Sequence, residues 1–414
     1  MPKAVRDIEL TKLPVLIDNL HSYDGAFLLL RYHGRPVGRI ILPTKNGQII
    51  LADHLKEIQE AVDKLLKHVI TDHFLFSDEE EFQTKATIAV CTRNRAEDLK
   101  FCLDSLMKLP DRGQEIIVVD NDPSTDDTKS LIKQYPSVRY VLEKRKGLNI
   151  ARNRAIVEAS NDIVVFTDDD AMVDVRWLDK IVRHFDDPMT MCVTGMAMPF
   201  ELETKAQEAF ENYNPFWKSF YKIRFSFSKP HPLSTGKIGA GVNMALRKSI
   251  ISKTGWFDEA LDAGTPTQSG GDHEFFARIM LAGYHIIYDP EALSWHRHRR
   301  TWKEAVKAIH GYGIGVYAFW TKLFLIERQY SIIQFPKFWL LDTQLPNFYK
   351  SLFGINKYPL SFLLAELHGC LKGPFAYLKS RNQTKKYFKT KRNEYPGKSY
   401  YSNPQPFRVF KKDA

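Results

Sequence analysis

From residue 86 to residue 168 the sequence repeats one pattern: a short apolar segment, a polar turn and a segment with helical spacing. The apolar segments read "ATIAVCT", "EIIVVD", "VRYVLE" and "DIVVFTD". Parallel strands need a long crossover connection, commonly a helix, so this alternation predicts a parallel sheet covered by helices. The expected fold class is α/β, with a Rossmann-like, parallel-rich sheet flanked by helices.

Polar residues follow three of these predicted strands: Thr92 to Arg95, Asp120 to Asp122, and Asp168 to Asp170. The carboxyl ends of parallel strands meet at one edge of the sheet, where α/β proteins bind their ligands. One such cluster alone is commonly a solvated turn. Three clusters at successive strand ends favour a single binding site of the kind that holds a nucleotide.

The stretch "VVFTDDDAMVD" places three carboxylates, Asp168, Asp169 and Asp170, directly after an apolar strand. Adjacent like charges repel one another and resist desolvation, so a cation or a solvated loop must take up the charge. Asp168 and Asp170 bracket one residue, and on an extended segment they face the same side. Oxygen ligands of this kind suit a hard divalent cation. Asp169 has a second interpretation, as a solvated residue or a cap of the next helix.

The pattern outside this region changes twice. Near the N-terminus, residues 24–42 read as two strands around a turn at His33 to Pro36, and a helical pattern runs from Leu55 to Val69. The charged run "SDEEEF" then marks a boundary, because adjacent acidic residues favour a solvated linker. We therefore expect a small N-terminal α+β domain (1–85), the α/β domain (86–300), a helical, aromatic-rich extension (301–380) and a basic tail (381–414).

The positive charge is concentrated at the C-terminal end of the chain. Between Lys372 and Ala414 there are twelve Lys or Arg and two acidic residues, which accounts for the whole net charge of +10. A basic segment rich in Tyr and Phe is either a solvated tail or a site that approaches an anionic membrane surface. Nucleic acid is not an expected partner, because no binding motif accompanies the charge.

The N-terminal residues and the cysteines bear on the compartment. The first twenty residues carry charges every few positions, and the four cysteines form no C-x-x-C pair. We therefore expect no export, a reducing compartment and a cytoplasmic location, with peripheral attachment to the inner face of the cell membrane as the alternative to a free protein. Residues 308–326 and 358–378 are apolar but carry charged residues, so neither is predicted to span a membrane.

From Ala86 to Arg300 the order of motifs resembles the inverting family-2 glycosyltransferases of the GT-A fold. The motifs that carry this resemblance are "AVCTRNR", "VVDNDPSTDDT", "KGLNIARNRAI", "VVFTDDDAMVDVRWL", "GAGVNMALRKS", "GWFDEAL" and "GGDHEFFARIMLAGYHIIYDPEALSWHRHRR". The resemblance implies that the three carboxylates contain the family's D-x-D element, which holds a divalent metal, Mn²⁺ or Mg²⁺, against a nucleotide-sugar diphosphate. A metal stabilises the charge that develops on such a leaving group.

The resemblance also implies roles for individual residues. The catalytic base is Asp272, just before the helix in "GGDHEFFARIMLAGY", with Glu274 as the neighbouring alternative. The metal ligands are Asp168 and Asp170, with His296 or His298 as an additional imidazole ligand. The residues expected to bind the nucleotide sugar are Thr92, Arg95, Asp120, Asn121, Arg152, Asn153, Asp168 and Asp169.

The activity implied by the family is direct displacement, in which one sugar moves from a nucleotide-diphosphate sugar to a hydroxyl group. The acceptor is a glycan, a lipid-linked glycan or a small molecule. Two other functions compete with this hypothesis: a nucleotide-sugar binding protein without turnover, and a nucleotidyltransferase. A pure binder needs no base, and a nucleotidyltransferase normally has a Gly-rich phosphate loop after its first strand, where "AVCTRNRAED" has no glycine.

Overall fold

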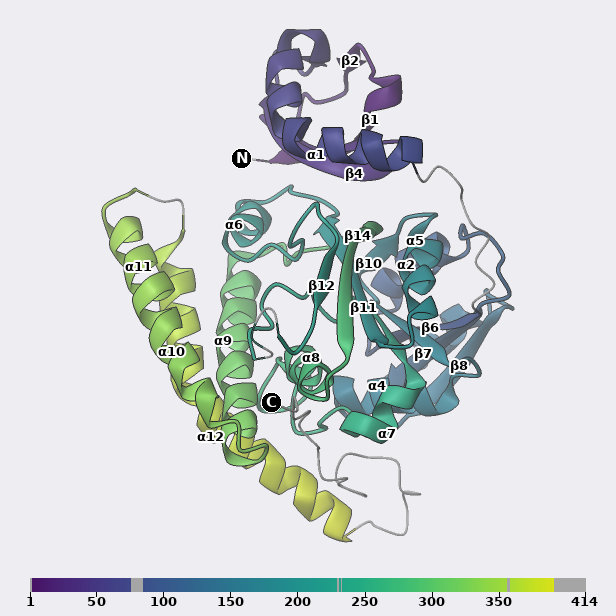
Figure 1. Ribbon diagram of the computed structural model, residues 1–414, viewed down its shortest axis with the longest axis vertical. Helices are drawn as coiled ribbons and strands as arrows, with labels where there is room; N and C mark the ends of the chain where they lie inside the picture. The colour runs from purple at the N-terminus through teal and green to yellow at the C-terminus, as the bar shows by residue number, and fades with distance from the viewer. Residues whose placement is uncertain (1, 76–84, 229–230, 232, 356–357, 391–414) are drawn as a thin grey trace.

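The computed structural model describes residues 2–75, 85–228, 231, 233–355 and 358–390. Three parts are visible in Figure 1: an N-terminal unit, a central α/β domain and a layer of long helices along one side of that domain. The α/β class, the parallel-rich sheet and the helical C-terminal region expected from the sequence are confirmed.

The N-terminal unit is a three-stranded sheet covered by one helix. Its strand order is β1-β3-β4, with β1 parallel to β3 and β3 antiparallel to β4. The predicted turn is present, with both His33 and Gly34 at positive φ. The unit contacts the central domain through Arg31, whose Nη1 lies 2.6 Å from Asp174 Oδ2. Its elements are β1 (Lys3–Glu9), β2 (Leu16–Ile17), β3 (Gly25–Tyr32), β4 (Arg35–Pro43), β5 (Ile49–Ile50) and α1 (Leu55–Leu75).

The central sheet has the strand order β10-β14-β11-β13-β9-β6-β7-β8, with β12 paired to β14. The four predicted strands β6, β7, β8 and β9 are parallel to one another, as expected. Beyond β9 the sheet becomes mixed, because β13 runs antiparallel to both β9 and β11. The strands are β6 (Ala86–Thr92), β7 (Glu115–Asn121), β8 (Val138–Glu143), β9 (Ile163–Asp168), β10 (Ala171–Val173), β11 (Thr190–Pro199), β12 (Ile223–Phe225), β13 (Asn243–Arg247) and β14 (His285–His296).

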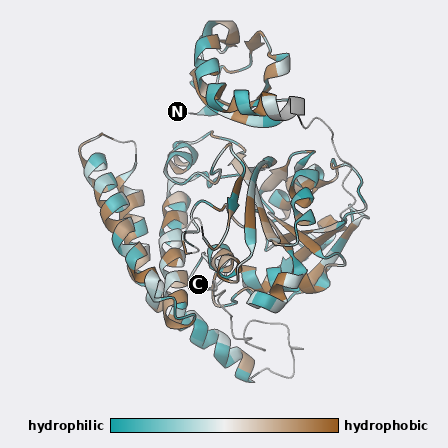
Figure 2. Ribbon diagram, in the orientation of Figure 1, coloured by the Kyte–Doolittle hydropathy of each residue, from teal (hydrophilic) through white to brown (hydrophobic). Residues whose placement is uncertain are grey.

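Side chains of this sheet alternate between two apolar cores. On β6, Ile88 and Val90 pack with α2 and α5 on one face, whereas Ala89 packs with α4 and α8 on the other. Because both faces are covered, the strands are almost entirely apolar, as the brown strands of Figure 2 show. The helices are α2 (Ala96–Leu106), α3 (Asp127–Ile132), α4 (Leu148–Glu158), α5 (Trp177–Val182), α6 (Lys205–Tyr213), α7 (Ile251–Thr254) and α8 (Gly271–Leu281).

The C-terminal layer consists of α9 (Trp302–Leu325), α10 (Gln334–Phe338), the π-helical turn η6 (Trp339–Gln344), α11 (Leu345–Leu352) and α12 (Leu360–Thr390). Helix α12 passes the boundary expected at residue 380 without a break and continues to Thr390. Residues 391–414 of the expected basic tail lie outside the described residues. Among the helices that are described, none combines the length and the apolarity needed to cross a bilayer.

Glycines allow α9 and α12 to approach each other closely. A Cβ atom on Gly313 of α9 would lie 2.3 Å from the carbonyl oxygen of Glu366, and one on Gly369 of α12 would lie 2.2 Å from that of His310. Both positions therefore exclude any side chain. The backbone contact fixes the spacing and the register of the two helices.

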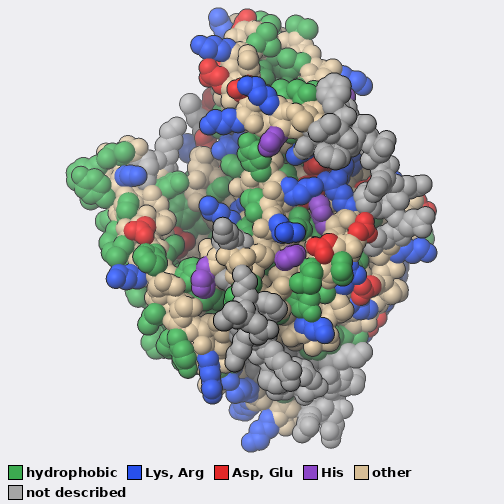
Figure 3. Space-filling model, in the orientation of Figure 1, with side chains coloured by type: hydrophobic (Ala, Val, Ile, Leu, Met, Phe, Trp, Pro, Cys, Tyr) green, Lys and Arg blue, Asp and Glu red, His purple; other side chains and the backbone are tan. Residues whose placement is uncertain are grey.

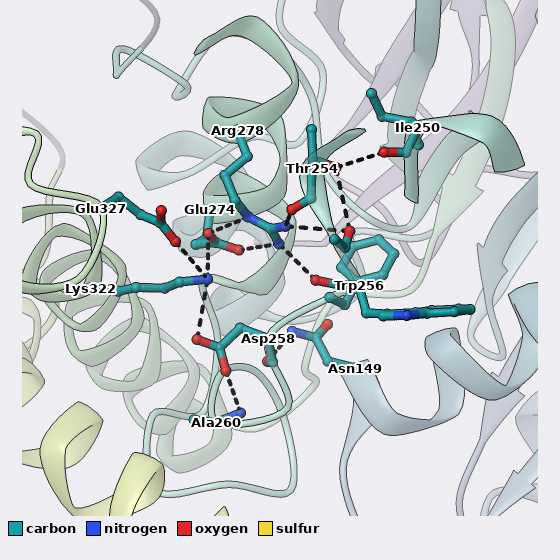
Figure 4. Close-up of polar contacts among 12 residues, drawn as sticks. Asn149, Ile250, Thr254, Trp256, Asp258, Ala260, Glu274, Arg278, Lys322 and Glu327 are labelled. Carbon is teal, nitrogen blue, oxygen red and sulfur yellow. Dashed lines mark hydrogen bonds and ion pairs between the residues drawn. The ribbon is translucent and has the colours of Figure 1, made fainter. Parts of the chain in front are cut away.

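A cluster of buried charges joins α9 to α8 and to the loop before it (Figure 4). Lys322 Nζ lies 2.7 Å from Glu274 Oε1 and 3.3 Å from Asp258 Oδ2, and all three side chains are fully buried. Arg278 adds a second cation, with its Nε 2.6 Å from Glu274 Oε1. Burial would raise the pKa of Glu274, but Arg278 and Lys322 outweigh this effect and hold its pKa below the usual value. The buried carboxylate of Glu274 therefore stays ionised because both cations lie beside it.

We predict that Lys322→Met destabilises the protein by roughly 3–5 kcal/mol, since it keeps the packing of the long side chain but leaves buried carboxylates short of a cation. Denaturant unfolding followed by circular dichroism measures the change. Lys307→Met is the matched control, because Lys307 lies on the same helix with its side chain exposed, and its stability should stay close to that of the parent. Equal unfolding midpoints for the two variants would show that the cluster does not hold the layer.

Candidate active site

The carboxyl end of β9 brings Asp168 and Asp170 next to His296. In the antiparallel pair of β10 and β14, Ala171 is the register partner of His296, so the last residue of β14 lies beside the carboxylates. One ligand atom from each of the three residues lies within 4.8 Å of the others. Two carboxylates and an imidazole, gathered at this distance, fit a divalent cation such as Mn²⁺ or Mg²⁺.

Asp169 points away from this group and toward the loop after β6. Its Oδ2 accepts a hydrogen bond from the Thr92 hydroxyl at 2.7 Å, and its Oδ1 accepts one from Arg95 Nη1 at 2.7 Å. Arg95 also donates from Nη2 to Asp170 Oδ2 at 2.7 Å. Thr92 and Arg95 therefore hold two of the three carboxylates, and Asp169 connects the end of β9 to the end of β6.

The pKa values of these three carboxyl groups shift in different directions. Burial and the neighbouring Asp170 raise the pKa of Asp168, and the same two causes raise the pKa of Asp169 to about 7. Burial would also raise the pKa of Asp170, but His296 and Arg95 outweigh it and hold this pKa well below its usual range. A divalent cation requires deprotonated ligands, so metal affinity is expected to rise with pH.

A cavity of about 660 Å³ opens beside the carboxylates. Asp168, Arg152 and Asp272 line it. Aromatic side chains of the C-terminal layer line it as well: Tyr312, Phe319, Trp320, Phe335, Phe338 and Trp339. The cavity therefore offers a ligand both charged groups and aromatic faces.

Asp272 lies in the first turn of α8, and two backbone amides hold its carboxylate. Oδ2 accepts a hydrogen bond from the amide of Gly241 at 2.8 Å, and Oδ1 accepts one from the amide of His273 at 2.8 Å. Burial would raise the pKa of Asp272, but nearby His273, Arg152 and these amides outweigh it and keep the pKa below its usual value. Asp272 is therefore ionised at neutral pH and able to accept a proton.

Glu274, the alternative base, does not line this cavity. Both of its oxygens are committed to Arg278, and one of them also contacts Lys322. Of the two carboxylates in "GGDHEF", the structure brings Asp272 to the cavity and places Glu274 in the buried ion cluster.

Residues 87–255 match the family described as "Glycosyl transferase family 2". This segment is a family-2 glycosyltransferase domain. The family resemblance predicted from the motifs is confirmed, and the match contains Asp168 and Asp170 of the candidate metal group.

Several relatives of the glycosyltransferase domain are known. The pre-mycofactocin glycosyltransferase of Mycobacterium tuberculosis is 26% identical over 230 residues, covering 54% of this chain and 46% of the relative. Glycosyltransferase AglE of Haloferax volcanii is 26% identical over 217 residues, covering 51% and 66%. The chain thus spans about half to two thirds of these relatives. The mannosyltransferase PcManGT of Pyrobaculum calidifontis, solved with GDP-Man and Mn²⁺, is 19% identical, with a TM-score of 0.44 and coverage of 78% and 82%.

The remaining residues expected to bind the donor lie in different surroundings within the glycosyltransferase domain. Arg152 lines the cavity, where its Nη1 donates to Asp262 Oδ2 at 2.8 Å. Asn153 instead exchanges two hydrogen bonds with the backbone of Phe257. Arg152 is therefore placed for a ligand, whereas Asn153 holds the loop before α8.

The two residues at the end of β7 also differ. Asp120 is buried and accepts a hydrogen bond from the Tyr140 hydroxyl at 3.0 Å through Oδ2, whereas its Oδ1 has no hydrogen-bond partner among the described residues. Asn121 binds the turn before α4, accepting from the Gly147 amide and donating to the Arg145 carbonyl. Asp120 is therefore a buried carboxyl group with one oxygen unpartnered among the described residues, and Asn121 holds the turn before α4.

The two candidate histidines are separated by their contacts. His296 Nε2 lies 3.2 Å from Asp170 Oδ1, whereas His298 Nε2 lies 2.9 Å from Glu211 Oε2. Burial lowers the pKa of His298, which favours a neutral ring. The structure therefore brings His296, and not His298, to the carboxylates.

Several cavity residues were not identified from the sequence. The cavity includes Lys218 and Asp262, which belong to none of the quoted motifs, and His273, which lies in "GGDHEFFARIMLAGY" without an expected role. For Gly241, the glycine-rich segment "GKIGAG" indicates a close approach of the backbone. A Cβ atom at this position would lie 2.3 Å from Arg152 Nη2. Only glycine therefore lets the backbone amide reach Asp272 beside this guanidinium. The aromatic cavity residues of the C-terminal layer lie beyond residue 300, and no sequence motif marks them as cavity residues.

We predict that His296→Gln lowers the affinity for Mn²⁺ roughly tenfold or more, since even the outer partners of metal ligands are worth about 10–100-fold. Calorimetry with Mn²⁺ in the presence of UDP or GDP measures the affinity. His298→Gln is the control, because the amide can keep the hydrogen bond to Glu211 and the metal affinity should not change. Loss of affinity only in His298→Gln would show that the metal ligands have been assigned incorrectly.

Proposed function

We propose that this protein is an inverting, metal-dependent glycosyltransferase that moves one sugar from a nucleotide-diphosphate sugar to a hydroxyl acceptor. One observation carries the proposal: the ionised carboxylate of Asp272 and the candidate metal ligand Asp168 line the same cavity. A base for the acceptor and a cation site for the leaving group are the two components that direct displacement requires.

The donor diphosphate would lie at the end of the cavity formed by the carboxyl edge of the sheet. Asp168, Asp170 and His296 would hold the divalent metal, which stabilises negative charge on the departing diphosphate. Arg152 lines the same cavity and offers a planar set of donors to phosphate oxygens. Oδ1 of Asp120, which is buried and has no hydrogen-bond partner among the described residues, would accept a hydrogen bond from the nucleobase or ribose.

Asp272 would act on the acceptor. As the acceptor oxygen forms its bond to the anomeric carbon, the bond from that carbon to the diphosphate oxygen breaks and its electron pair leaves with the diphosphate. The hydroxyl proton passes to a carboxylate oxygen of Asp272. The amides of Gly241 and His273 hold this carboxylate in one orientation, so that little reorganisation is needed during the reaction. Attack opposite the leaving group inverts the anomeric carbon.

Peripheral attachment to an anionic membrane surface through the basic tail is a further part of the proposal. Twelve Lys or Arg between Lys372 and Ala414 support it, since each basic residue near an anionic surface contributes about 1 kcal/mol. An attached enzyme would meet a lipid-linked acceptor at the surface. A soluble glycan or small molecule would need no such attachment.

We predict that Asp272→Asn lowers transfer by roughly 10²–10⁴-fold while nucleotide affinity stays nearly unchanged, because the amide keeps the shape but cannot take the proton. Donor turnover and calorimetry with UDP-, GDP- and dTDP-sugars measure the two quantities. Asp170→Asn should instead weaken metal and nucleotide binding together.

Asp342→Asn is the matched control, since Asp342 lines the same cavity without the two amide contacts of Asp272. Its turnover should remain close to that of the parent. Full turnover in Asp272→Asn would reject the base assignment and favour a nucleotide-sugar binding protein. Loss of turnover in Asp342→Asn alone would assign the base to Asp342 instead.

A further inference from the structure

Helix α12 carries an exposed apolar stripe that no other described element covers. Leu364, Leu371, Phe375 and Leu378 follow one another at intervals of seven, four and three residues, which places them on one side of the helix. Leu371 is 75% exposed and Phe375 76%. The opposite side is buried, with Gly369, Gly373 and Tyr377 against α9 and the central domain.

A second stripe with similar spacing runs along α10, η6 and α11. It consists of Phe338, Leu341, Leu345, Tyr349 and Leu352, whose exposed fractions lie between 48% and 60%. In Figure 3, hydrophobic side chains gather along the border of the molecule where these helices lie. Large apolar surfaces of this kind mark interaction sites.

Basic residues dominate the charges on these helices, and the one exposed carboxylate on their described residues is Asp342 of η6. From Thr343 to Thr390 the only acidic residue is Glu366, and its carboxylate points inward, accepting hydrogen bonds from Tyr213 and Gln344. Exposed basic side chains flank the α12 stripe and continue along the last turns of the helix, where Figure 2 changes from brown to teal. These are Lys372, Lys379, Lys385, Lys386 and Lys389.

We propose that this face, formed by the two stripes and the flanking lysines, lies on the surface of an anionic bilayer. Amphipathic helices with a basic polar side bury their apolar residues at the boundary between headgroups and acyl chains without crossing the membrane. Lysines beside such a stripe extend their aliphatic stems over the apolar surface and place the ammonium groups among anionic headgroups.

The charge pattern favours a bilayer over a second copy of the chain. In a two-fold dimer the same patch meets itself, so the five exposed lysines of one α12 would face those of the other, and Asp342 of η6, the one exposed carboxylate on the described residues of this face, is too little to balance them. Like charges placed together across an interface oppose association. An anionic lipid surface supplies the missing negative charge.

This placement has a consequence for the acceptor, which rests on the proposed function. Phe338 belongs to the exposed stripe and also lines the cavity, together with Phe335 and Trp339. The part of the cavity that Phe338 lines would therefore adjoin the lipid surface. An acceptor with an apolar anchor could then present its hydroxyl group to Asp272 without leaving the membrane.

Sedimentation of the full chain with phosphatidylcholine vesicles, with and without phosphatidylglycerol, tests the proposal. Binding to the anionic vesicles is expected, and the double variant Leu371→Ser with Phe375→Ser should lower the partition coefficient roughly tenfold or more, because it removes the two most exposed apolar groups of the α12 stripe. Val15→Ser with Val175→Ser is the matched control, since both valines are exposed but lie outside the helical layer. That variant should sediment like the parent.

A chain that ends at Thr390 keeps the helices and removes residues 391–414 of the tail. Retained binding of this chain supports the helical face, whereas complete loss of binding on truncation alone would assign attachment to the tail and overturn the proposal. A concentration-dependent dimer that the serine variant abolishes, without vesicle binding by the parent, would identify a protein interface instead. Donor turnover is measured separately in solution, so failure of the proposed transferase function would leave the vesicle result unaffected.

Discussion

The arrangement of the site depends on how three adjacent carboxylates are kept together at the end of a buried strand. Like charges in a low-dielectric setting are tolerated only when opposite charges or hydrogen-bond donors compensate them. Here the compensation comes from distant parts of the chain: Thr92 and Arg95 after β6, and His296 at the end of β14. The carboxylates of Asp168 to Asp170 therefore tie together the ends of three strands, two of which are adjacent in the sheet and one of which lies beyond β13 and β11.

Much of the central domain could be predicted because its signals are local. The four apolar strands follow from spacing within single segments, and the structure has them at nearly the expected bounds. The mixed part of the sheet had no such signal. Strands β11, β13 and β14 pair with partners tens of residues away, and β11 is buried along its whole length, so its sequence shows no alternation.

The same distinction applies to the candidate site. Asp168, Asp170 and Asp272 lie in recognisable motifs, whereas the choice between His296 and His298 depends on the register of β14 against β10, which the sequence does not contain. The aromatic residues that line the cavity are harder still to predict. Residues such as Tyr312 and Trp339 face the cavity only because the C-terminal layer packs against the central domain, through the ion cluster around Lys322.

The backbone contact between α9 and α12 gives a criterion for reading related sequences. A side chain at Gly313 or Gly369 would meet a carbonyl oxygen of the facing helix, and one at Gly373 would lie 2.5 Å from Cβ of Tyr317. Exposed positions of both helices can vary without disturbing this contact. A homologue that keeps small residues at these three positions is thus expected to retain the whole helical layer, even where the rest of that region has diverged beyond alignment. A homologue with bulky residues there must arrange its helices differently, and its cavity must have a different shape.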